Sequence, residues 1–168
     1  MSEITQQQDS RRIFIDTLIE LVESDSAVCL IVPDVGFNYI EKFKERFPNR
    51  FFNFGVTEAS TILIATAMAL DGWKPYCYSM INFVLLRPYE MVRNGVCYHN
   101  ANVKLIGVKG SEKYRFLGLS HNLLGSENEE DLLKNLPNIK RYYPNSIDEV
   151  REIVIKSYKE ESPTYIRL

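Results

Sequence analysis

The sequence has no apolar run of the roughly 18 to 20 residues that a membrane-spanning helix requires. Its N-terminus, MSEITQQQDSRR, is polar and lacks the basic-then-apolar order of a signal peptide. Cysteine is scarce, and Cys29, Cys77 and Cys97 form an odd, scattered set that suits neither a disulfide framework nor a zinc site. We therefore expect a cytoplasmic protein whose own residues form no metal site.

An excess of one charge is lacking as well, since 20 Lys and Arg face 22 Asp and Glu, for a net charge of -2. Such a balance gives no long-range attraction to nucleic acid or to an anionic membrane, so neither is an expected partner. A chain of 168 residues is long enough for one core and short for two. Because no repeat or Gly/Ser linker marks a boundary, we expect a single domain over residues 1–168.

A glycine-rich phosphate loop is also missing. The segment VPDVGFN, which follows the first buried-type apolar run, contains one glycine, which argues against a nucleotide-binding Rossmann domain. The last long connection, VKGSEKYRFLGLSHNLLGSEN, exceeds the usual loop length and is typical of a binding segment. We expect function to lie in the loops beyond the carboxyl ends of the strands.

Short apolar runs and helical patterns alternate along the chain. This order predicts a doubly wound α/β fold with a mostly parallel sheet and helices on both faces. The predicted strands are AVCLIVP, RFFNFG, KPYCYSM, VKLIGV, IKRYY and PTYIRL. The predicted helices are RRIFIDTLIELVES, YIEKFKERF, a long apolar helix from about Thr57 to near Gly72, RPYEMVRNGVCYH, EEDLLKNL and IDEVREIVIKSYKE.

Glu58 stands at the head of the most apolar of these helices, with no other charge before Asp71. One interpretation is helix capping, in which Thr57 caps the helix and Glu58 favours its positive end by about 0.3 to 1 kcal/mol. The other starts from the helix being apolar nearly all round, so that we expect it to be interior. Burial would then favour a protonated, hydrogen-bond-donating carboxyl. Placement alone leaves both interpretations open.

Three apolar or aromatic side chains, Phe83, Leu86 and Tyr89, recur every three residues just after a predicted strand. The pattern is typical of a helical core stripe, and it also suits a pocket for a flat heteroaromatic ring. Arg87 and Arg93 are candidates for binding an anionic substrate, and the expected alternative is an ion pair with Glu90.

Four segments occur in a specific order: FPNRFFNFGVTEAS, YSMINFVLLRPYEMVRNGVCYHNANVKLIGV, LGLSHN and LPNIKRYYPNS. Together they resemble the pyrimidine-binding domain of transketolase and its relatives, including deoxyxylulose-phosphate synthase. The resemblance covers residues 30 to 145. It implies thiamine diphosphate as cofactor, with Glu58 in the position of the glutamate whose carboxyl donates a hydrogen bond to the aminopyrimidine ring. A buried, protonatable carboxyl suits that role.

The resemblance also assigns expected roles to other residues. Phe83 and Tyr89 match aromatic positions of the aminopyrimidine pocket, and Leu86 stands where transketolases often carry a third aromatic residue. Asp34, in PDVGFN, resembles an aspartate of the family's first loop and is expected near the cofactor. His121 matches a catalytic histidine that contacts substrate oxygens, although LGLS precedes it in place of the family's Asp-Gly-Pro-Thr.

The family binds the diphosphate and its Mg²⁺ through a separate domain with a Gly-Asp-Gly motif, and nothing in this sequence fits that motif. We expect the C-terminal domain usual in transketolases to be absent as well. This chain is therefore expected to supply half of a thiamine diphosphate site and to be inactive alone. The other half, including the Mg²⁺ ligands, is expected from a diphosphate-binding subunit in a hetero-oligomer that could be built on a homodimer.

The reaction that the resemblance implies is transfer of a two-carbon ketol unit between sugars. One alternative is a subunit of a thiamine-diphosphate-dependent 2-oxo acid decarboxylase, because some small decarboxylases are similarly divided. Another is a non-catalytic domain that keeps the fold for assembly. Lys113 and Arg115, in the long loop, are candidates for binding a substrate phosphate, and they are equally candidates for solvent-facing residues.

Overall fold

The computed structural model describes residues 3–110, 112–123 and 127–168, with side chains described for 10–110, 114–123 and 127–168. Within these residues, six strands form one all-parallel sheet in the order β2-β1-β3-β4-β6-β5, which confirms the predicted doubly wound α/β fold. The strands are β1 (Val28–Val32), β2 (Phe51–Asn53), β3 (Lys74–Met80), β4 (Lys104–Val108), β5 (Lys140–Tyr142) and β6 (Thr164–Arg167).

The α-helices are α1 (Glu3–Ser24), which precedes β1, and α2 (Glu41–Arg46), α3 (Glu58–Leu70), α4 (Tyr89–Met91), α5 (Glu129–Leu133) and α6 (Ile147–Tyr158), which lie between strands. Between strands there are also the 3-10 helices η1 (Pro48–Arg50) and η4 (Glu112–Ser120) and the π-helical segments η2 (Asn82–Leu86) and η3 (Val92–Cys97). The predicted helix over 87–99 belongs to a longer segment in which two π-helical stretches, η2 and η3, flank the short α4.

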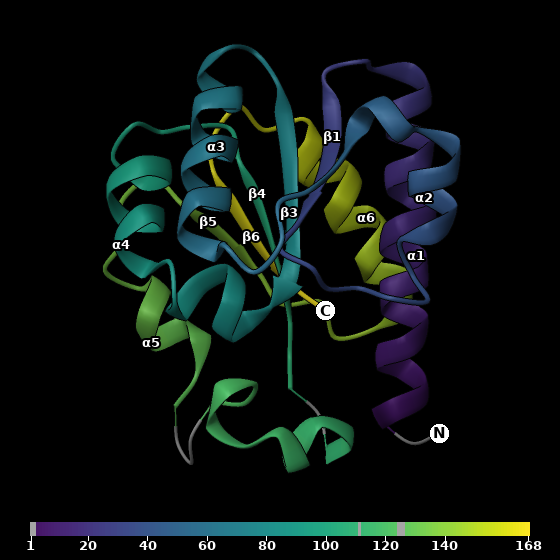
Figure 1. Ribbon diagram of the computed structural model, residues 1–168, viewed down its shortest axis with the longest axis vertical. Helices are drawn as coiled ribbons and strands as arrows, with labels where there is room; N and C mark the ends of the chain where they lie inside the picture. The colour runs from purple at the N-terminus through teal and green to yellow at the C-terminus, as the bar shows by residue number, and fades with distance from the viewer. Residues whose placement is uncertain (1–2, 111, 124–126) are drawn as a thin grey trace.

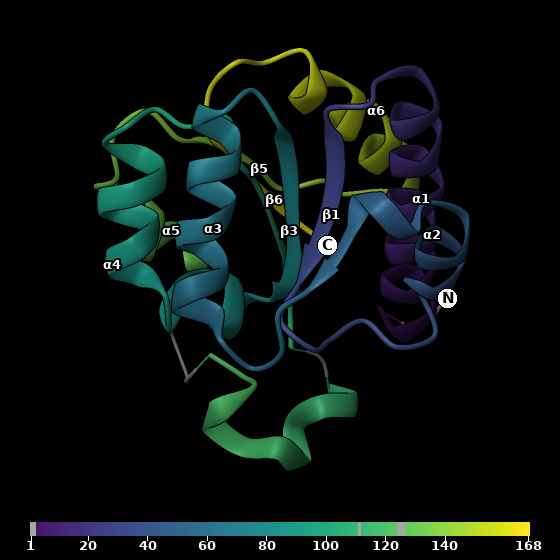
Figure 2. The same cartoon turned by 45° about the horizontal axis from the view of Figure 1, so that its top comes forward.

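Helices cover both faces of the sheet, with α1, α2 and α6 on one side and α3, α4 and α5 on the other (Figures 1 and 2). On the first side the ring of Phe14 stacks on that of Tyr78, with centroids 5.6 Å apart. On the second side Ile62 of α3 and Val96 of η3 belong to a buried apolar cluster that also contains Leu105 of β4. Strands covered on both faces explain the continuous apolar runs in the sequence.

The expectation that α3 is interior nearly all round is wrong for one of its faces. Ile62 and Ala65 are buried against the sheet, whereas Leu63 is 48% exposed and Leu70 is 60% exposed. Apolar residues on both faces of a helix do not show whether a given face lies in the core or on a surface that another chain covers. Of the helices that the structure describes, none has the length and apolar character needed to cross a membrane.

The carboxyl ends of the parallel strands meet at one edge of the sheet. The loop after β1, the start of α3, η2 and the loop with η4 all lie there, and η4 is the green segment below the sheet in Figures 1 and 2. The functional loops expected from the sequence therefore lie at one edge, as open parallel sheets require.

The buried lysine of β4 gives a test of the packing at the opposite edge. Lys104 is fully buried, and its Nζ donates to the carbonyl oxygens of Glu160 and Ser162 at 2.9 and 3.0 Å. Burial lowers the pKa of Lys104 from 10.5 to about 7. Between these two values the unfolded chain holds a proton that the folded chain has released, so the stability of the fold rises with pH in that window.

We expect the wild-type free energy of unfolding to gain up to about 1.4 kcal/mol per pH unit relative to Lys104→Met between pH 7.5 and 9.5. Urea unfolding at several pH values measures this difference. Lys159→Met, which removes an exposed lysine close in sequence to the same turn, is the matched control. Parallel pH profiles for the wild type and Lys104→Met would contradict the account.

Candidate functional site

Glu58 is the first residue of α3, at the carboxyl edge of the sheet, and is 9% exposed. The capping interpretation receives no support from Thr57. Its side chain makes no capping bond to the helix and instead donates from Oγ1 to the carbonyl oxygen of Phe54 at 2.9 Å. Glu58 is therefore a carboxyl brought inside at the start of a helix, where it needs a hydrogen-bond donor from elsewhere in the fold.

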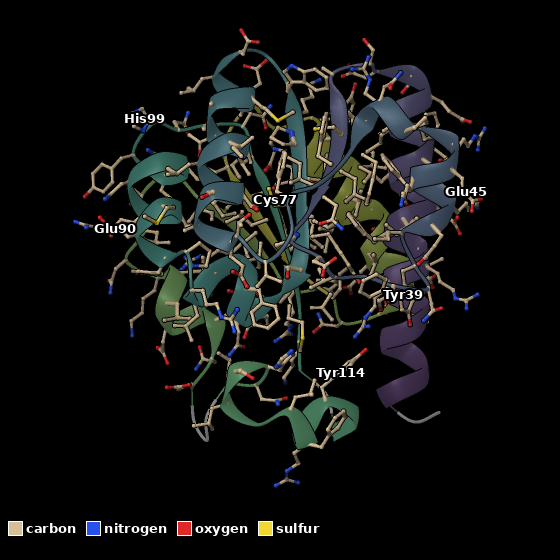
Figure 3. All side chains as sticks on the ribbon, viewed as in Figure 1. Tyr39, Glu45, Cys77, Glu90, His99 and Tyr114 are labelled. Carbon is tan, nitrogen blue, oxygen red and sulfur yellow. The ribbon has the colours of Figure 1, made fainter. Side chains whose placement is uncertain are left out.

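That donor is Arg87, which follows η2. Its Nη1 lies 2.6 Å from Oε1 of Glu58, and the carbon of its guanidinium lies 4.2 Å from the centre of the Phe83 ring. The expected pair with Glu90 is absent from the ion pairs of the described residues. Figure 3 shows Glu90 on the outer side of the helical layer, facing away from the sheet. Glu58, Phe83 and Arg87 therefore form one contact group.

A crevice of about 10 Å³ lies beneath this group, and Glu58, Ser79 and Phe83 are among the residues that line it. The Oγ of Ser79 is buried and has no hydrogen-bond partner among the described residues. The volume is about that of one water-sized sphere, so an aromatic ring does not fit within the crevice. Arg87, the ion-pair partner of Glu58, is not among the residues that line it.

A larger cavity, of about 330 Å³, shares Phe83 and Ser79 with the crevice as lining residues. Asp34, Phe83 and His121 all line it, so the structure brings together three residues from three separate loops. The His121 ring meets Phe83 edge-on at 4.8 Å, and Nδ1 of His121 lies 2.7 Å from Oγ of Ser120. The sequence predicted these three residues as site residues without giving their relative positions.

Arg11 of α1 also lines this cavity, and the sequence reasoning missed it. Its side chain is 7% exposed and lies between two rings, with the guanidinium carbon 5.3 Å from the centre of Tyr39 and 5.7 Å from that of Tyr114. Nη1 donates to the Tyr114 hydroxyl at 3.3 Å, whereas Nε is buried without a partner. Figure 3 shows Tyr114 rising from η4 and Tyr39 beside α1 and α2.

No carboxylate pairs with Arg11 in the part of the chain whose side chains are described. A buried guanidinium without a counter-charge is costly, which makes the cavity suited to an anionic group. The helical spacing of Arg11 was the sequence signal that could have identified it. Arg11 precedes Phe14, Ile15 and Leu18 at helical spacing and so stands on the apolar face of its helix, whereas Arg12 is exposed.

The η4 segment closes the cavity through side-chain amides. Asn82, which is 4% exposed, donates from Nδ2 to the carbonyl oxygens of Leu119 and Asn122 at 3.1 and 3.3 Å. Asn122 in turn donates to the carbonyl oxygens of Tyr114 and Gly118 at 3.0 and 2.9 Å. The position of His121 therefore depends on Asn82, a second residue that the sequence did not single out.

Leu86, Tyr89 and Arg115 are not among the residues that line the crevice or the cavity. Leu86 is 41% exposed on the surface beside Arg87, and the Tyr89 hydroxyl donates to the carbonyl oxygen of Leu132 at 2.9 Å. Arg115 is exposed on η4, and the side chain of Lys113 lies outside the described residues. In the described part of the chain no group of three or more His, Cys, Asp or Glu residues is placed to hold a metal ion.

Comparison with known proteins places this arrangement in a family. The transketolase pyrimidine binding domain family matches residues 6–168 of the chain. The chain belongs to this family. The match extends beyond residues 30–145, over which the motifs had indicated the resemblance, and includes α1 from residue 6 onward.

Among curated relatives, the chain is 30% identical over 157 residues to a subunit of the apulose-4-phosphate transketolase of Actinobacillus succinogenes, covering 93% of this chain and 50% of the relative. It is 26% identical over 159 residues to a subunit of the 6-deoxy-6-sulfo-D-fructose transketolase of Clostridium sp. strain MSTE9, covering 94% of this chain and 48% of the relative. The chain thus spans about half the length of the curated relatives it matches.

A solved structure gives the same result. A protein described as a split gene transketolase in an inactive beta4 tetramer superposes with a TM-score of 0.80 at 29% identity, over 95% of this chain and 50% of that chain. The transketolase-like pyrimidine-binding fold and the likeness to split transketolase subunits are therefore shown together. The roles of individual residues in the site are not part of that likeness.

The amide contacts of Asn82 predict how the η4 segment is held. Asn82→Asp keeps the shape of the side chain but removes the Nδ2 donor, and it sets a carboxylate against two carbonyl oxygens. We expect amide hydrogen exchange in residues 112–123 to accelerate by about tenfold while the exchange of β3 and β4 is unchanged. Asn49→Asp, at an exposed position, is the control. Unchanged exchange in 112–123 would contradict this role of Asn82.

Proposed function

We propose that this chain supplies the pyrimidine-binding half of a thiamine-diphosphate-dependent, transketolase-like active site. The observation that carries the proposal is the placement of Glu58. A carboxyl that is 9% exposed opens a helix at the carboxyl edge of a parallel sheet, with the Phe83 ring beside it. The family match and the transketolase subunits among the relatives support the same assignment.

The residues present fit the aminopyrimidine part of such a cofactor. That ring is flat and carries nitrogen atoms at its edge, so Phe83 would pack against its face and the Glu58 carboxyl would hydrogen-bond a nitrogen at its edge. The guanidinium of Arg87 is itself a flat group with N–H donors, and it makes one contact of each kind, to Phe83 and to Glu58. When bound, thiamine diphosphate supplies a carbon nucleophile and an electron sink for cleaving a bond next to a carbonyl.

The chain's own residues have distinct tasks in this proposal. Glu58 holds a proton on its carboxyl and donates it in a hydrogen bond to the ring nitrogen of the cofactor. Burial at the head of α3 keeps competing water away from that bond. Phe83 offers a ring face to the cofactor position and also lines the 330 Å³ cavity, so it adjoins both the cofactor position and the substrate space of this proposal. His121 and Asp34 line that substrate space.

A second subunit completes the site in this proposal. Nothing in the sequence fits the motif that binds the diphosphate and Mg²⁺, so we assign both to a partner chain. The uncovered apolar side chains support a partner surface near Glu58. Val56 is 68% exposed and Leu63 is 48% exposed, although both belong to or adjoin α3. We expect a hetero-oligomer, with the reacting site between subunits.

The substrate class proposed is a ketose with an anionic end, from which a two-carbon unit is transferred. Arg11 supports the anionic end, because its buried guanidinium lines the cavity without a carboxylate partner among the described side chains. The two relatives named for their substrates point the same way, since one name contains a phosphate and the other a sulfo group. Ketol transfer is favoured over decarboxylation of a 2-oxo acid because both names are those of transketolases.

Glu58→Gln tests the proposed function. Glutamine keeps the shape and a contact to Arg87, but it cannot hold and release a carboxyl proton. We expect the thermal midpoint to change little and turnover of the complex of this chain with its diphosphate-binding subunit to fall by about 10² to 10⁴-fold. Glu90→Gln, an exposed change in the same layer, should leave turnover intact.

If Glu58→Gln retained full turnover in that complex, Glu58 would be a structural residue and the domain's contribution would be assembly. Release of CO₂ from a 2-oxo acid without need for an aldose acceptor would instead identify a decarboxylase. A full rate from the purified chain alone would contradict the shared site.

Arg11→Met tests the anionic substrate class. Methionine keeps most of the apolar stem but removes the charge and the donors. We expect KM for a phosphorylated or sulfonated ketose to rise by about 10 to 100-fold, with kcat changed little and with KM for an uncharged ketose unaffected. Arg12→Met, an exposed neighbour on the same helix, is the control. An equal rise in KM for charged and uncharged ketoses would show that Arg11 acts through packing.

A further inference from the structure

We propose that Arg87 is an internal occupant of the aminopyrimidine position, which the cofactor ring must displace when the two subunits assemble a site. The inference rests on the proposed function. In this inference the Arg87 guanidinium and the cofactor ring compete for the same two contacts. One contact is with the Glu58 carboxyl, and the other is with the Phe83 ring.

The geometry shows why the two occupants exclude each other. Nη1 of Arg87 lies 2.6 Å from Oε1 of Glu58, and the same guanidinium lies 4.2 Å from the centre of the Phe83 ring. Phe83 is 7% exposed, and its ring also borders the 330 Å³ cavity, but Glu58 does not line that cavity. A flat ring that stacks on Phe83 and hydrogen-bonds Glu58 must therefore take the volume that the guanidinium fills.

The crevice beneath the pair offers no alternative position. It measures about 10 Å³, and its lining includes Glu58 and Phe83 themselves. A ring cannot approach Glu58 from below without moving the core, because the crevice walls include Ile62 and Cys77, at 2% and 1% exposure. Approach from the Arg87 side remains, and it requires the guanidinium to leave.

Arg87 is able to leave at a modest free-energy cost. Its side chain is 44% exposed, so its departure exposes no core and its charge regains solvent. Ion pairs and cation–π contacts at such partly exposed positions contribute little individually. Glu58, by contrast, has a side chain that is 10% exposed and needs a replacement hydrogen-bond partner once Arg87 has gone. In this proposal the carboxylate takes up a proton from solvent as the guanidinium leaves and donates it to the incoming ring nitrogen, which accepts.

Two consequences follow, one for the separate chain and one for the assembled complex. Arg87 satisfies the buried carboxyl before assembly, so the site is stable without its cofactor. The measured affinity for thiamine diphosphate also includes the free energy of displacing Arg87, which lowers it below the affinity of an open site. A variant that lacks the guanidinium should therefore bind the cofactor more tightly.

The test measures the Kd of thiamine diphosphate with Mg²⁺ by calorimetric titration of the complex with its diphosphate-binding subunit. Three forms of this chain are compared: wild type, Arg87→Met, which keeps the apolar stem, and Arg87→Ala. We expect the two Arg87 variants to bind about three- to tenfold more tightly than wild type. Arg93→Ala removes another exposed arginine of the same segment, one that lies over Tyr98, and should leave the Kd unchanged.

A double-mutant cycle separates displacement from general loosening. In a Glu58→Gln background the ion pair is already lost, so Arg87→Met should tighten binding by less than it does in the wild type. A Kd that is unchanged or weaker in both Arg87 variants, with wild type binding normally, overturns the inference and leaves the proposed function standing. If the assembled wild-type complex binds no thiamine diphosphate, the proposed function fails first and the inference falls with it.

Discussion

The buried carboxyl of Glu58 is the constraint on which the site depends. A carboxyl at 9% exposure is stable only if a donor meets it, and in this structure the donor is a guanidinium from 29 residues further along the chain. That requirement ties the head of α3 to the end of η2 and sets both against Phe83. Because α3, η2 and η4 all start from the same edge of a parallel sheet, one contact group connects the cofactor side to the substrate cavity.

The strand and helix order was predictable from the sequence because local patterns determine it. The continuous apolar runs AVCLIVP and VKLIGV predicted the buried strands β1 and β4, and the apolar run predicted to begin at about Thr57 is the helix α3, which begins at Glu58. The surroundings of α3 were not predictable in the same way. Its apolar residues contact the sheet on one side and are exposed on the other. A single sequence does not distinguish apolar residues of the core from apolar residues of a surface that another chain covers.

The candidate site was predictable as a set of residues and not as a set of contacts. The motifs indicated Glu58, Phe83 and His121, and the structure places Phe83 against both of the others. Arg87 was expected to pair with its sequence neighbour Glu90, since spacing on a helix carries no information about a partner on another element. Arg11 was missed because two adjacent arginines look alike in sequence, and only burial between Tyr39 and Tyr114 separates the functional candidate from its exposed neighbour.

The central claim is that this chain holds half of a cofactor site. The most direct measurement is a calorimetric titration of thiamine diphosphate with Mg²⁺ into this chain alone, into its diphosphate-binding subunit alone and into the two together. The account predicts saturable, high-affinity binding in the mixture and none to this chain alone. Equal binding with and without this chain, in a mixture shown to be assembled, would contradict it and return Glu58 to the role of a buried helix-terminal residue.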